Sequence, residues 1–496
     1  MVMLATHFDG VGSVSRRLAR HAGSRRTSAR LANAKWWLMS IAAATPFAAG
    51  AQVSTNLERA PTLTIERYSE DWTAFADPEN RKGRWTERFK YIPLSDDGTI
   101  YLTTGIEARS RYESYENVNW NASQDDSYVW NRLMPYADLH VGNVRVFAQP
   151  ILSAISGTDR TKGPADTTGV DMLQAFVDVE LAVPGDASLQ LSAGRKLVSF
   201  GSGRFIDRRY GTGVPLPFDG VEAILTGEVH QLTGFYLQPV DTKIGGFNDR
   251  RSRNKAVWGL YATQWFDAKH LNGFDVYYIG LRDRNAVFDQ GAGKQLAHTL
   301  GSRIFGDDGA WHWNAEAAIQ LGTFAGHRSA AWGAGAEMGY RFRNRPLRPE
   351  VALTADVVSG DRDPDDPKLG TLNSLFPNGK YFGALSPIGP RNLIHLRPSI
   401  SVYPHKDVAV SLTGVAYWRQ STADGIYAIP GLLVRSGQQS DARFIGKQIE
   451  LATSWQVTSE LNLTASLSAF DPGSFIRDTG SARTIRMAGA QATFRF

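Results

Sequence analysis

The stretch LNLTASLSA, residues 461–469, decides the fold because it alternates without a break. Its apolar positions are Leu461, Leu463, Ala465, Leu467 and Ala469, and its polar positions are Asn462, Thr464, Ser466 and Ser468. Successive side chains of a strand point to opposite faces, so this pattern predicts a β-strand with one apolar and one polar face.

About eighteen stretches of this kind follow one another from Tyr101 to the end of the chain. They begin near residues 101, 127, 144, 170, 188, 218, 230, 255, 273, 295, 310, 329, 348, 392, 407, 443, 461 and 482. In the hydrocarbon of a membrane every backbone group must be paired, so strands there have to close into a barrel. The predicted fold class is therefore all-β, a transmembrane antiparallel β-barrel of about 18 strands.

The connections between these stretches alternate in length. Short turns such as Gly142-Asn143 and PHKD at 404–407 are separated by long polar segments at 117–126, 158–169, 201–217, 241–254, 285–294, 361–391, 420–442 and 472–481. Only the connection near 325–328 breaks the pattern by being short. Outer-membrane barrels have long loops outside and tight turns in the periplasm, and an even strand number places both termini in the periplasm.

The first 51 residues have the features of an export signal. Lys35 precedes an apolar run from Trp36 to Ala49, and the run ends in the small residues Ala49-Gly50-Ala51, which predicts cleavage after Ala51. Three regions follow: an N-terminal extension and signal peptide at 1–51, a periplasmic lead-in at 52–100 and the barrel at 101–496. The lead-in is expected to fold back at the periplasmic mouth as a short plug or helix. The predicted location is the bacterial outer membrane.

Composition excludes several classes of function. Cysteine is absent, which rules out disulfides, thiolate metal sites and a cysteine nucleophile. Seven of the 54 Lys and Arg residues, but only one acid (Asp9), lie in residues 1–51, so the rest of the chain is nearly neutral and gives no argument for nucleic-acid binding. The ten histidines form no H-E-x-x-H motif, and no phosphate-binding loop is present. We therefore expect no enzyme activity, no cofactor and no metal.

One acidic run invites a calcium hypothesis. Asp361, Asp363, Asp365 and Asp366 alternate, but Asp366 and Leu372 stand where the EF-hand template needs glycine and glutamate. A solvated extracellular loop is the favoured interpretation, and a structural ion is the alternative.

Three blocks resemble the bacterial alginate-export family of outer-membrane barrels. They are EDWTAFADPENRKGRWTERFKYIPLSDDGTIYLTTGIEARSRYE at 70–113, WNRLMPYADLHVG at 130–142 and SAGRKLVSFGSGRFIDRRYGTGVPLPFDGVEAIL at 192–225. The resemblance extends from about residue 66 to Phe496. It implies an eighteen-stranded barrel with a narrow, arginine-lined constriction that admits an anionic polysaccharide.

The alternation itself predicts which charged residues face the lumen. In the first two strands the polar face carries Glu107, Arg109, Arg111, Glu113, Arg132 and Asp138. Later strands add Asp178, Glu180, Asp356, His395 and Arg397. Guanidinium stays charged and can fork onto a carboxylate, which suits a uronate chain. A ladder of arginine–carboxylate pairs that only braces the wall is an equal alternative for any single arginine.

Arg195 is a special case. It matches the arginine of the family's GR motif, yet it shares its phase with Leu189, Leu191 and Ala193. We expect a bulge near Gly194 to turn it inward.

The favoured function is a channel for an anionic polysaccharide or small anionic solutes. A general porin-like uptake channel for small sugars or anions is the first alternative, and a surface adhesin or a lipid-modifying barrel enzyme is the alternative of another class. The expected partners are outer-membrane lipid and lipopolysaccharide, the transported anion, and the barrel assembly machinery, which would read the terminal Phe496. Substrate, direction, gating and oligomeric state stay open.

Overall fold

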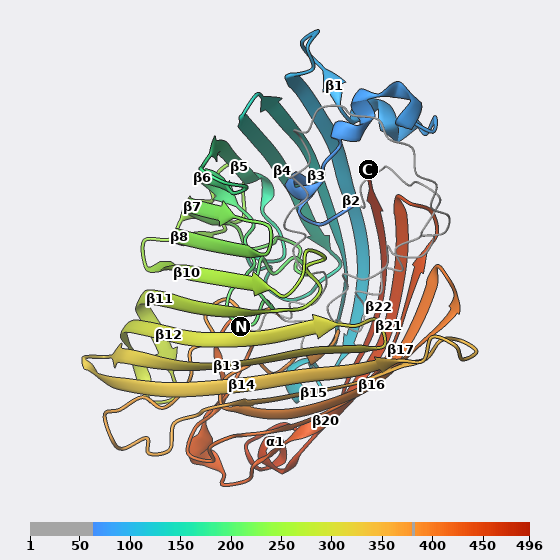
Figure 1. Ribbon diagram of the computed structural model, residues 1–496. Coiled ribbons are helices and arrows are strands. Elements are labelled where there is room, and N and C mark those ends of the chain that lie inside the picture. The colour runs from blue at the N-terminus through green and yellow to red at the C-terminus, as the bar shows by residue number, and fades with distance from the viewer. Residues whose placement is uncertain (1–62, 379–381) are drawn as a thin grey trace.

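Eighteen antiparallel strands form a closed ring in the computed structural model, which describes residues 63–378 and 382–496 (Figure 1). In chain order they are β2 (Ile100–Glu116), β3 (Asp126–Val141), β4 (Val144–Ser156), β5 (Gly169–Ala182), β6 (Ser188–Lys196), β7 (Phe218–Thr226), β8 (His230–Asp241), β10 (Lys255–Trp265), β11 (Gly273–Phe288), β12 (Gly291–Asp307), β13 (Trp311–Phe324), β14 (His327–Arg341), β15 (Glu350–Val358), β16 (Leu393–His405), β17 (Val408–Trp418), β20 (Phe444–Gln456), β21 (Leu461–Pro472) and β22 (Ile485–Arg495). Each pairs with the next, and β22 pairs back onto β2 from Glu107–Arg495 to Glu116–Arg486. The predicted all-β barrel is confirmed, and every predicted strand lies within a few residues of an observed one.

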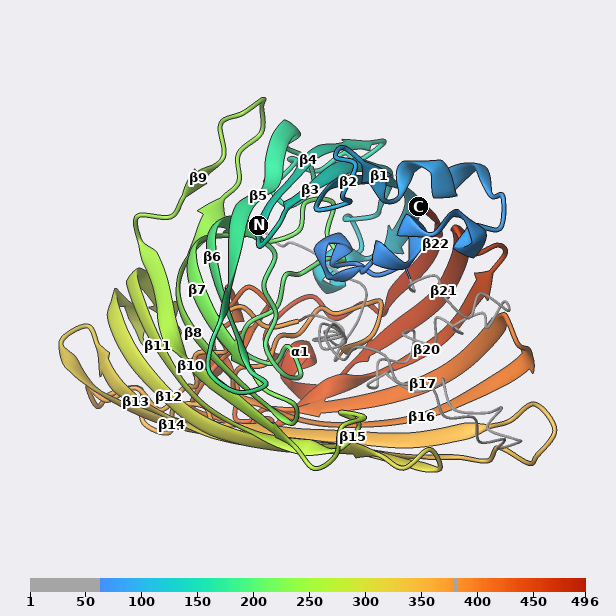
Figure 2. The ribbon, with the colours of Figure 1, turned by 45° about the horizontal axis from the view of Figure 1, so that its top comes forward.

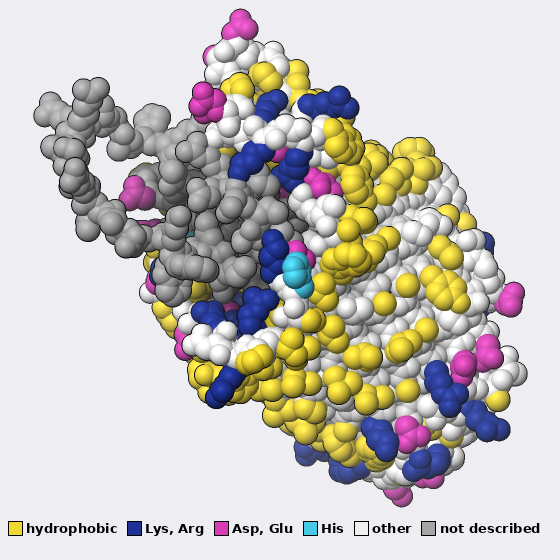
Figure 3. Space-filling view, turned by 90° about the vertical axis from the view of Figure 1, so that its right-hand side faces the viewer, with side chains coloured by type: hydrophobic (Ala, Val, Ile, Leu, Met, Phe, Trp, Pro, Cys, Tyr) yellow, Lys and Arg dark blue, Asp and Glu magenta, His cyan; other side chains and the backbone are white. Residues whose placement is uncertain are grey.

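The outer wall is apolar across its middle, as a lipid-facing surface requires. Exposed side chains of this wall include Val177, Leu191, Val221, Leu260, Val276, Leu300, Ile319, Leu353, Leu396, Leu412, Leu451 and Leu467. Figure 3 shows hydrophobic side chains spread over the strands, with charged groups gathered toward the ends of this face. Among the described residues no helix is long and apolar enough to cross a membrane.

Long loops gather at one end of the ring, the loop end, and tight turns at the other, the turn end. The connection near 325–328 is the two-residue turn Ala325-Gly326, as predicted. The predicted long loop at 285–294 is wrong, because β11 and β12 continue to a two-residue turn at Asp289-Gln290. The polar residues that suggested a loop belong to a hairpin whose tip binds the loop 419–443, where Gly437 donates to Asp289 Oδ2 at 2.7 Å.

The lead-in closes the seam between the first and last strands at the turn end. It consists of four short 3-10 helices, η1 (Arg67–Ser69), η2 (Thr73–Ala76), η3 (Pro78–Asn80) and η4 (Trp85–Phe89), followed by β1 (Ile92–Pro93). β22 ends opposite Glu107, and the next residue, Phe496, bonds Ile106. The edge of β2 before Ile106 has no partner from β22, and β1 pairs there with Tyr101 and Leu102. Figure 2, which brings this end forward, shows the lead-in beside the C-terminus.

Aromatic and charged contacts hold the lead-in in this position. Trp85 and Phe89 pack against Phe496, with ring centroids 5.2 and 5.5 Å apart, and Arg67 donates to the Phe496 carbonyl at 2.6 Å. Lys90 is buried and donates to Thr104 O and Tyr136 Oη at 2.7 and 2.6 Å. The predicted signal peptide at 1–51 and its cleavage site lie outside the described residues.

Candidate functional site

Two loops fold from the loop end into the lumen and give the barrel an interior core. They are loop 197–217, between β6 and β7, and loop 359–392, between β15 and β16, of which residues 359–378 and 382–392 are described. Phe205 and Ile206 of the first and Leu372 and Phe376 of the second belong to one buried cluster with inward aromatics of the wall, such as Tyr277. The interior of the barrel is therefore filled by loops as well as by inward side chains of the strands.

Backbone hydrogen bonds join these two loops. Asp207 N donates to Phe376 O at 2.9 Å, Phe376 N to Phe205 O at 2.8 Å, and Asn378 N to Gly203 O at 2.9 Å. The loop 359–392 is tied to the wall by Asn373, whose amide nitrogens donate to Gln320 and Gln295 at 2.9 and 2.6 Å. Because these bonds link opposite sides of the ring through its interior, the two loops form one connected partition.

Three of the predicted lumenal arginines come together against loop 197–217. Arg109 and Arg132 lie directly opposite each other in β2 and β3. Arg132 Nη1 donates to Tyr210 O and Thr212 O at 3.0 and 3.1 Å, Arg111 Nη1 donates to Gly211 O at 2.8 Å, and Arg109 binds the same carbonyls as Arg132. We call Arg109, Arg111 and Arg132 the arginine trio. All three are buried, and their guanidinium groups hold three consecutive loop carbonyls.

Carboxylates compensate part of this positive charge. Arg132 Nη2 lies 2.8 Å from Glu107 Oε1, and Arg495 Nε lies 2.7 Å from Glu107 Oε2. Tyr210 of the loop also hydrogen-bonds Glu107, and Arg111 pairs with Glu113 at 3.1 Å. Glu107 and the trio are buried on the inner side of the wall, and their place in a solute path stays a prediction.

Asp138 of β3 and Asp178 of β5, two of the predicted lumenal acids, belong to a different cluster near the turn end. Arg145 donates two hydrogen bonds to Asp138, and it lies opposite Asp178 in the neighbouring strand. Arg145 also binds the Tyr68 carbonyl, so this cluster contacts the lead-in. Glu180 lies further along β5, half-buried, two residues before that strand ends.

The expectation for Arg195 is wrong in its geometry. The registers of β6 with β5 and with β7 run through Gly194 and Arg195 without a shift, so there is no bulge there. Arg195 stays on the face of the exposed Leu191, and it forks onto Asp219, directly opposite in β7, at 2.7 and 3.0 Å. It braces the wall near the loop end and does not join the trio.

Arg397 faces inward from β16, the fourteenth strand of the ring, and is buried. It lies opposite Thr354 of β15, and the carboxylates of Glu337 and Glu450 interact with it electrostatically. It is therefore not part of the trio, which lies on the first and second strands.

The sequence interpretation missed several charged groups of the lumen. Arg204, on loop 197–217, pairs with Glu316 at 3.3 Å and with Asp356 at 2.7 Å, and Arg303 pairs with Asp275 at 2.6 Å. The dense arginines of GSGRFIDRRYG at 201–211 were a signal for the first of these, but strand alternation says nothing about residues outside strands.

The acidic run at 361–366 agrees in part with the expectation of a solvated loop, because Asp363 and Asp365 are exposed, whereas Asp361 is buried. Asp361 accepts hydrogen bonds from Asp363 N and Gly370 N at 3.0 and 2.6 Å, and its backbone nitrogen donates to Asp424 at 3.0 Å. Burial raises the pKa of both Asp361 and Asp424. Within residues 63–378 and 382–496, no group of three or more His, Asp or Glu side chains is arranged to hold a metal ion.

The comparison with protein families decides the identity of this barrel. The model of the family described as alginate export matches residues 100–489. The chain belongs to the alginate-export family. This is a family of channel barrels and not of enzymes, and no curated protein matches the chain.

Solved structures share the fold of this alginate-export barrel at low sequence identity. OccD3 (OpdP) of Pseudomonas aeruginosa aligns with a TM-score of 0.53 and 10% identity over 82% of this chain and 93% of its own. OccAB1 of Acinetobacter baumannii gives 0.53 and 12% over 83% and 99%, and Pseudomonas aeruginosa OccK2 (OpdF), solved with glucuronate, gives 0.51 and 12% over 80% and 96%. The chain is thus a barrel like those of Gram-negative outer-membrane channels.

Proposed function

We propose that this alginate-export barrel is an outer-membrane channel that passes anionic saccharides or other small anionic solutes through its arginine-containing lumen. The observation that carries the proposal is the arginine trio, three inward guanidinium groups at the point where loop 197–217 crosses the lumen. Positive groups in a low-dielectric passage concentrate anions and lower their barrier to entry.

The loop carbonyls occupy the trio in the way that the oxygens of an anion would. A carboxylate presents two acceptor oxygens to a guanidinium fork, and a charged acceptor binds more strongly than a neutral carbonyl. An anion that reaches the trio therefore competes with Tyr210–Thr212 for the same donors. Passage then requires loop 197–217 to release these bonds, which makes the loop a gate.

The solved structure of OccK2 with glucuronate supports a sugar acid as the class of solute, because that channel has the same fold. The short turns and the long loops support an orientation with the loop end at the cell surface and both termini in the periplasm. The apolar outer wall then faces lipid and lipopolysaccharide, and the terminal Phe496 is the contact offered to the assembly machinery during insertion.

A second candidate is a porin-like channel for small neutral sugars. The pairs Arg204–Glu316, Arg204–Asp356 and Arg303–Asp275 favour it, because a lumen whose charges are paired selects weakly. Export and uptake are both compatible with either candidate.

Planar-bilayer recordings of the purified full-length barrel test the proposal. In a KCl gradient the reversal potential should have the sign of anion preference, and Arg132→Gln should move it toward zero. A barrel that stays electrically silent, or one that prefers cations, would contradict an anion channel. A non-selective pore with measurable flux of neutral sugars would favour the second candidate.

A further inference from the structure

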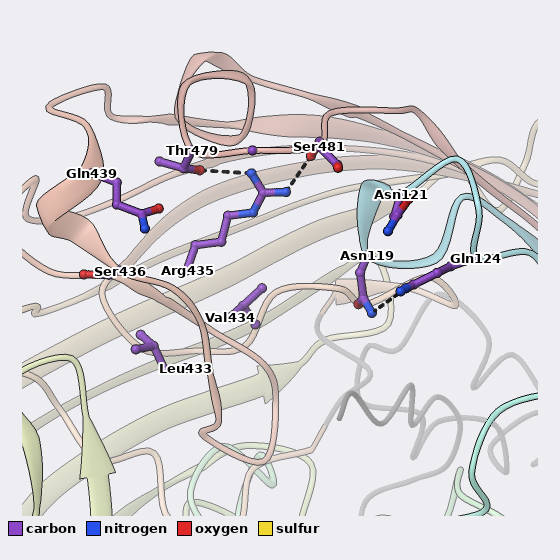
Figure 4. Close-up of a pocket in the computed structure, with 11 residues that line it drawn as sticks. Asn119, Asn121, Gln124, Leu433, Val434, Arg435, Ser436, Gln439, Thr479 and Ser481 are labelled. Atoms are coloured by element: carbon purple, nitrogen blue, oxygen red, sulfur yellow. Dashed lines mark hydrogen bonds between the residues drawn. The ribbon is translucent and has the colours of Figure 1, made fainter.

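A pocket of about 430 Å³ opens at the loop end, apart from the arginine trio. Three loops form it: 117–125 after β2, 419–443 after β17, and 473–484 before β22 (Figure 4). The first and third of these flank the seam of the barrel, because β2 and β22 are its first and last strands. Its volume lies within the range that sites for small molecules occupy.

The lining of this pocket has one chemical character. Four carboxamides (Asn119, Asn121, Gln124, Gln439) and three hydroxyls (Ser436, Thr479, Ser481) surround it, with Leu433 and Val434 as an apolar patch and Arg435 as the charged side chain. No acidic residue is among the side chains that line it. A carboxamide offers both a donor and an acceptor, as does a sugar hydroxyl, so the two groups pair in either direction.

Arg435 is held across the pocket by its own hydrogen bonds. Its Nη1 donates to Ile476 O and Thr479 Oγ1 at 2.6 and 3.0 Å, and its Nη2 donates to Ser481 O at 2.5 Å. Figure 4 shows the Arg435 side chain extending from strand β19 (Leu433–Arg435), with its guanidinium group beside Thr479 and Ser481. Its carbon lies 5.2 Å from the centre of the Trp120 ring, so the charge is fixed in place by an aromatic support.

The loop that carries the amides is also fixed, and it is strained. Asn117, Asn119 and Trp120 all have left-handed backbones, with φ of 57°, 57° and 61°. Asparagine tolerates this conformation, but for a bulky residue such as tryptophan it is a true outlier that surrounding structure must maintain. Trp120 is 1% exposed, packs on Phe470 with ring centroids 5.8 Å apart, and its carbonyl accepts from Arg483 N at 3.0 Å. Strain of this kind gathers at binding sites, where it orders groups before the ligand arrives.

The opposite wall is ordered by a single arginine. Arg419 is fully buried and donates to the carbonyls of Thr422, Asp424, Ser440 and Ala442, which fixes the course of loop 419–443. Both walls therefore present their polar groups on segments that lose little entropy on binding.

We propose that this pocket binds a uronate unit of a saccharide at the outer mouth of the barrel. The amides and hydroxyls match the ring hydroxyls, Leu433 and Val434 match the C–H face of the ring, and Arg435 matches the carboxylate. The absence of acids from the lining disfavours cations. The site goes beyond the proposed transport, because it lies on the loop end and binding there is measured without ion flow.

Isothermal titration of the purified full-length barrel tests this site, with trigalacturonate as the probe and maltotriose as its neutral counterpart. Gln439 lines the pocket, and its exposed neighbour Gln438 does not, so Gln439→Leu and Gln438→Leu form a matched pair. Each lost hydrogen bond should weaken binding about three- to tenfold. We expect this loss for Gln439→Leu and Gln124→Leu, and unchanged binding for Gln438→Leu.

Three results would overturn the assignment: trigalacturonate does not bind the wild type, all three variants bind alike, or maltotriose binds as tightly as trigalacturonate. The binding result is independent of whether the channel proposal is correct. If the barrel binds trigalacturonate but is electrically silent, the channel proposal is refuted and the binding site is supported. If it conducts anions selectively but does not bind trigalacturonate, the channel proposal is supported and the binding site is refuted.

Discussion

Arg109 and Arg132 lie directly opposite each other on adjacent strands, and both donate to the carbonyl oxygens of Tyr210 and Thr212. Like charges in opposite register repel each other unless other groups compensate them. Here Glu107 and the loop carbonyls supply that compensation, so the loop and the charged wall stabilise each other.

Removing one arginine of the trio should loosen the loop. Arg132→Gln loses the ion pair with Glu107 and the bonds to two carbonyls, and we expect it to cost about 2 kcal/mol of unfolding free energy. Hydrogen exchange of residues 205–215 should become faster. The control is Arg486→Gln, whose pair with Glu116 is 66% and 53% exposed and should contribute less than about 1 kcal/mol. Equal exchange in the two variants would contradict an anchoring role.

Arg195 and Arg132 should differ in their effect on selectivity. Because Arg195 pairs with Asp219 on the face of Leu191, Arg195→Gln should leave the reversal potential in a KCl gradient unchanged. Arg132→Gln should shift it toward zero. A shift as large for Arg195→Gln would place that residue in the ion path.

Docking of the lead-in should depend on pH through Lys90. Burial, with the nearby charge of Arg67, lowers the pKa of Lys90 to about 7, whereas an exposed lysine has a pKa near 10.5. Between these values the undocked lead-in binds more protons, so docking strengthens as pH rises from 7 and is weakest below it. Trypsin cleavage after Arg88, normalised to cleavage of a free peptide, should therefore slow between pH 7 and 9.

Lys90→Met is the control for this effect, because it removes the titrating group and keeps the apolar stem. Its cleavage rate should show little dependence on pH over the same range. A wild-type rate that rises with pH would contradict the assignment to Lys90.

Gly105 should not tolerate a side chain. A Cβ there would collide with the Phe496 carbonyl and the Tyr136 ring and would lie 2.7 Å from Lys90 Nζ. Gly105→Ala should cost about 1–3 kcal/mol, measured by urea unfolding in detergent. Gly234→Ala is the matched control, since the nearest atom to its added Cβ is Leu260 Cδ2 at 3.4 Å. Equal stability of the two variants would refute a tight seam.

The strands could be predicted from sequence because alternation is a local property that lipid and lumen impose on every strand. The failures have equally local causes. Leu173 shares its alternation phase with the exposed Val177, but β5 contains an extra residue where Gln149–Gln174 changes to Pro150–Met172, and this bulge turns Leu173 into the lumen. A bulge was expected at Gly194 instead, one strand away.

The content of the lumen could not be predicted in the same way. Alternation indicated that Arg132 points inward but not that Tyr210 and Thr212, about eighty residues later, would receive its hydrogen bonds. Such contacts depend on the course of an irregular loop, and the alternation of apolar and polar residues does not predict that course. Arg204 was missed for the same reason.

The seam joins parts of the chain that are far apart in sequence. Arg67 binds the carbonyl of Phe496, 429 positions later, and β1 pairs with the part of β2 that extends beyond β22. The lead-in precedes every strand of the ring in the chain, yet its docking site includes Phe496, which follows the last strand. A contact of such long range forms only after the entropy cost of closing the intervening chain has been met. Protection of the lead-in from protease therefore reports that the first and last strands have paired and the ring has closed.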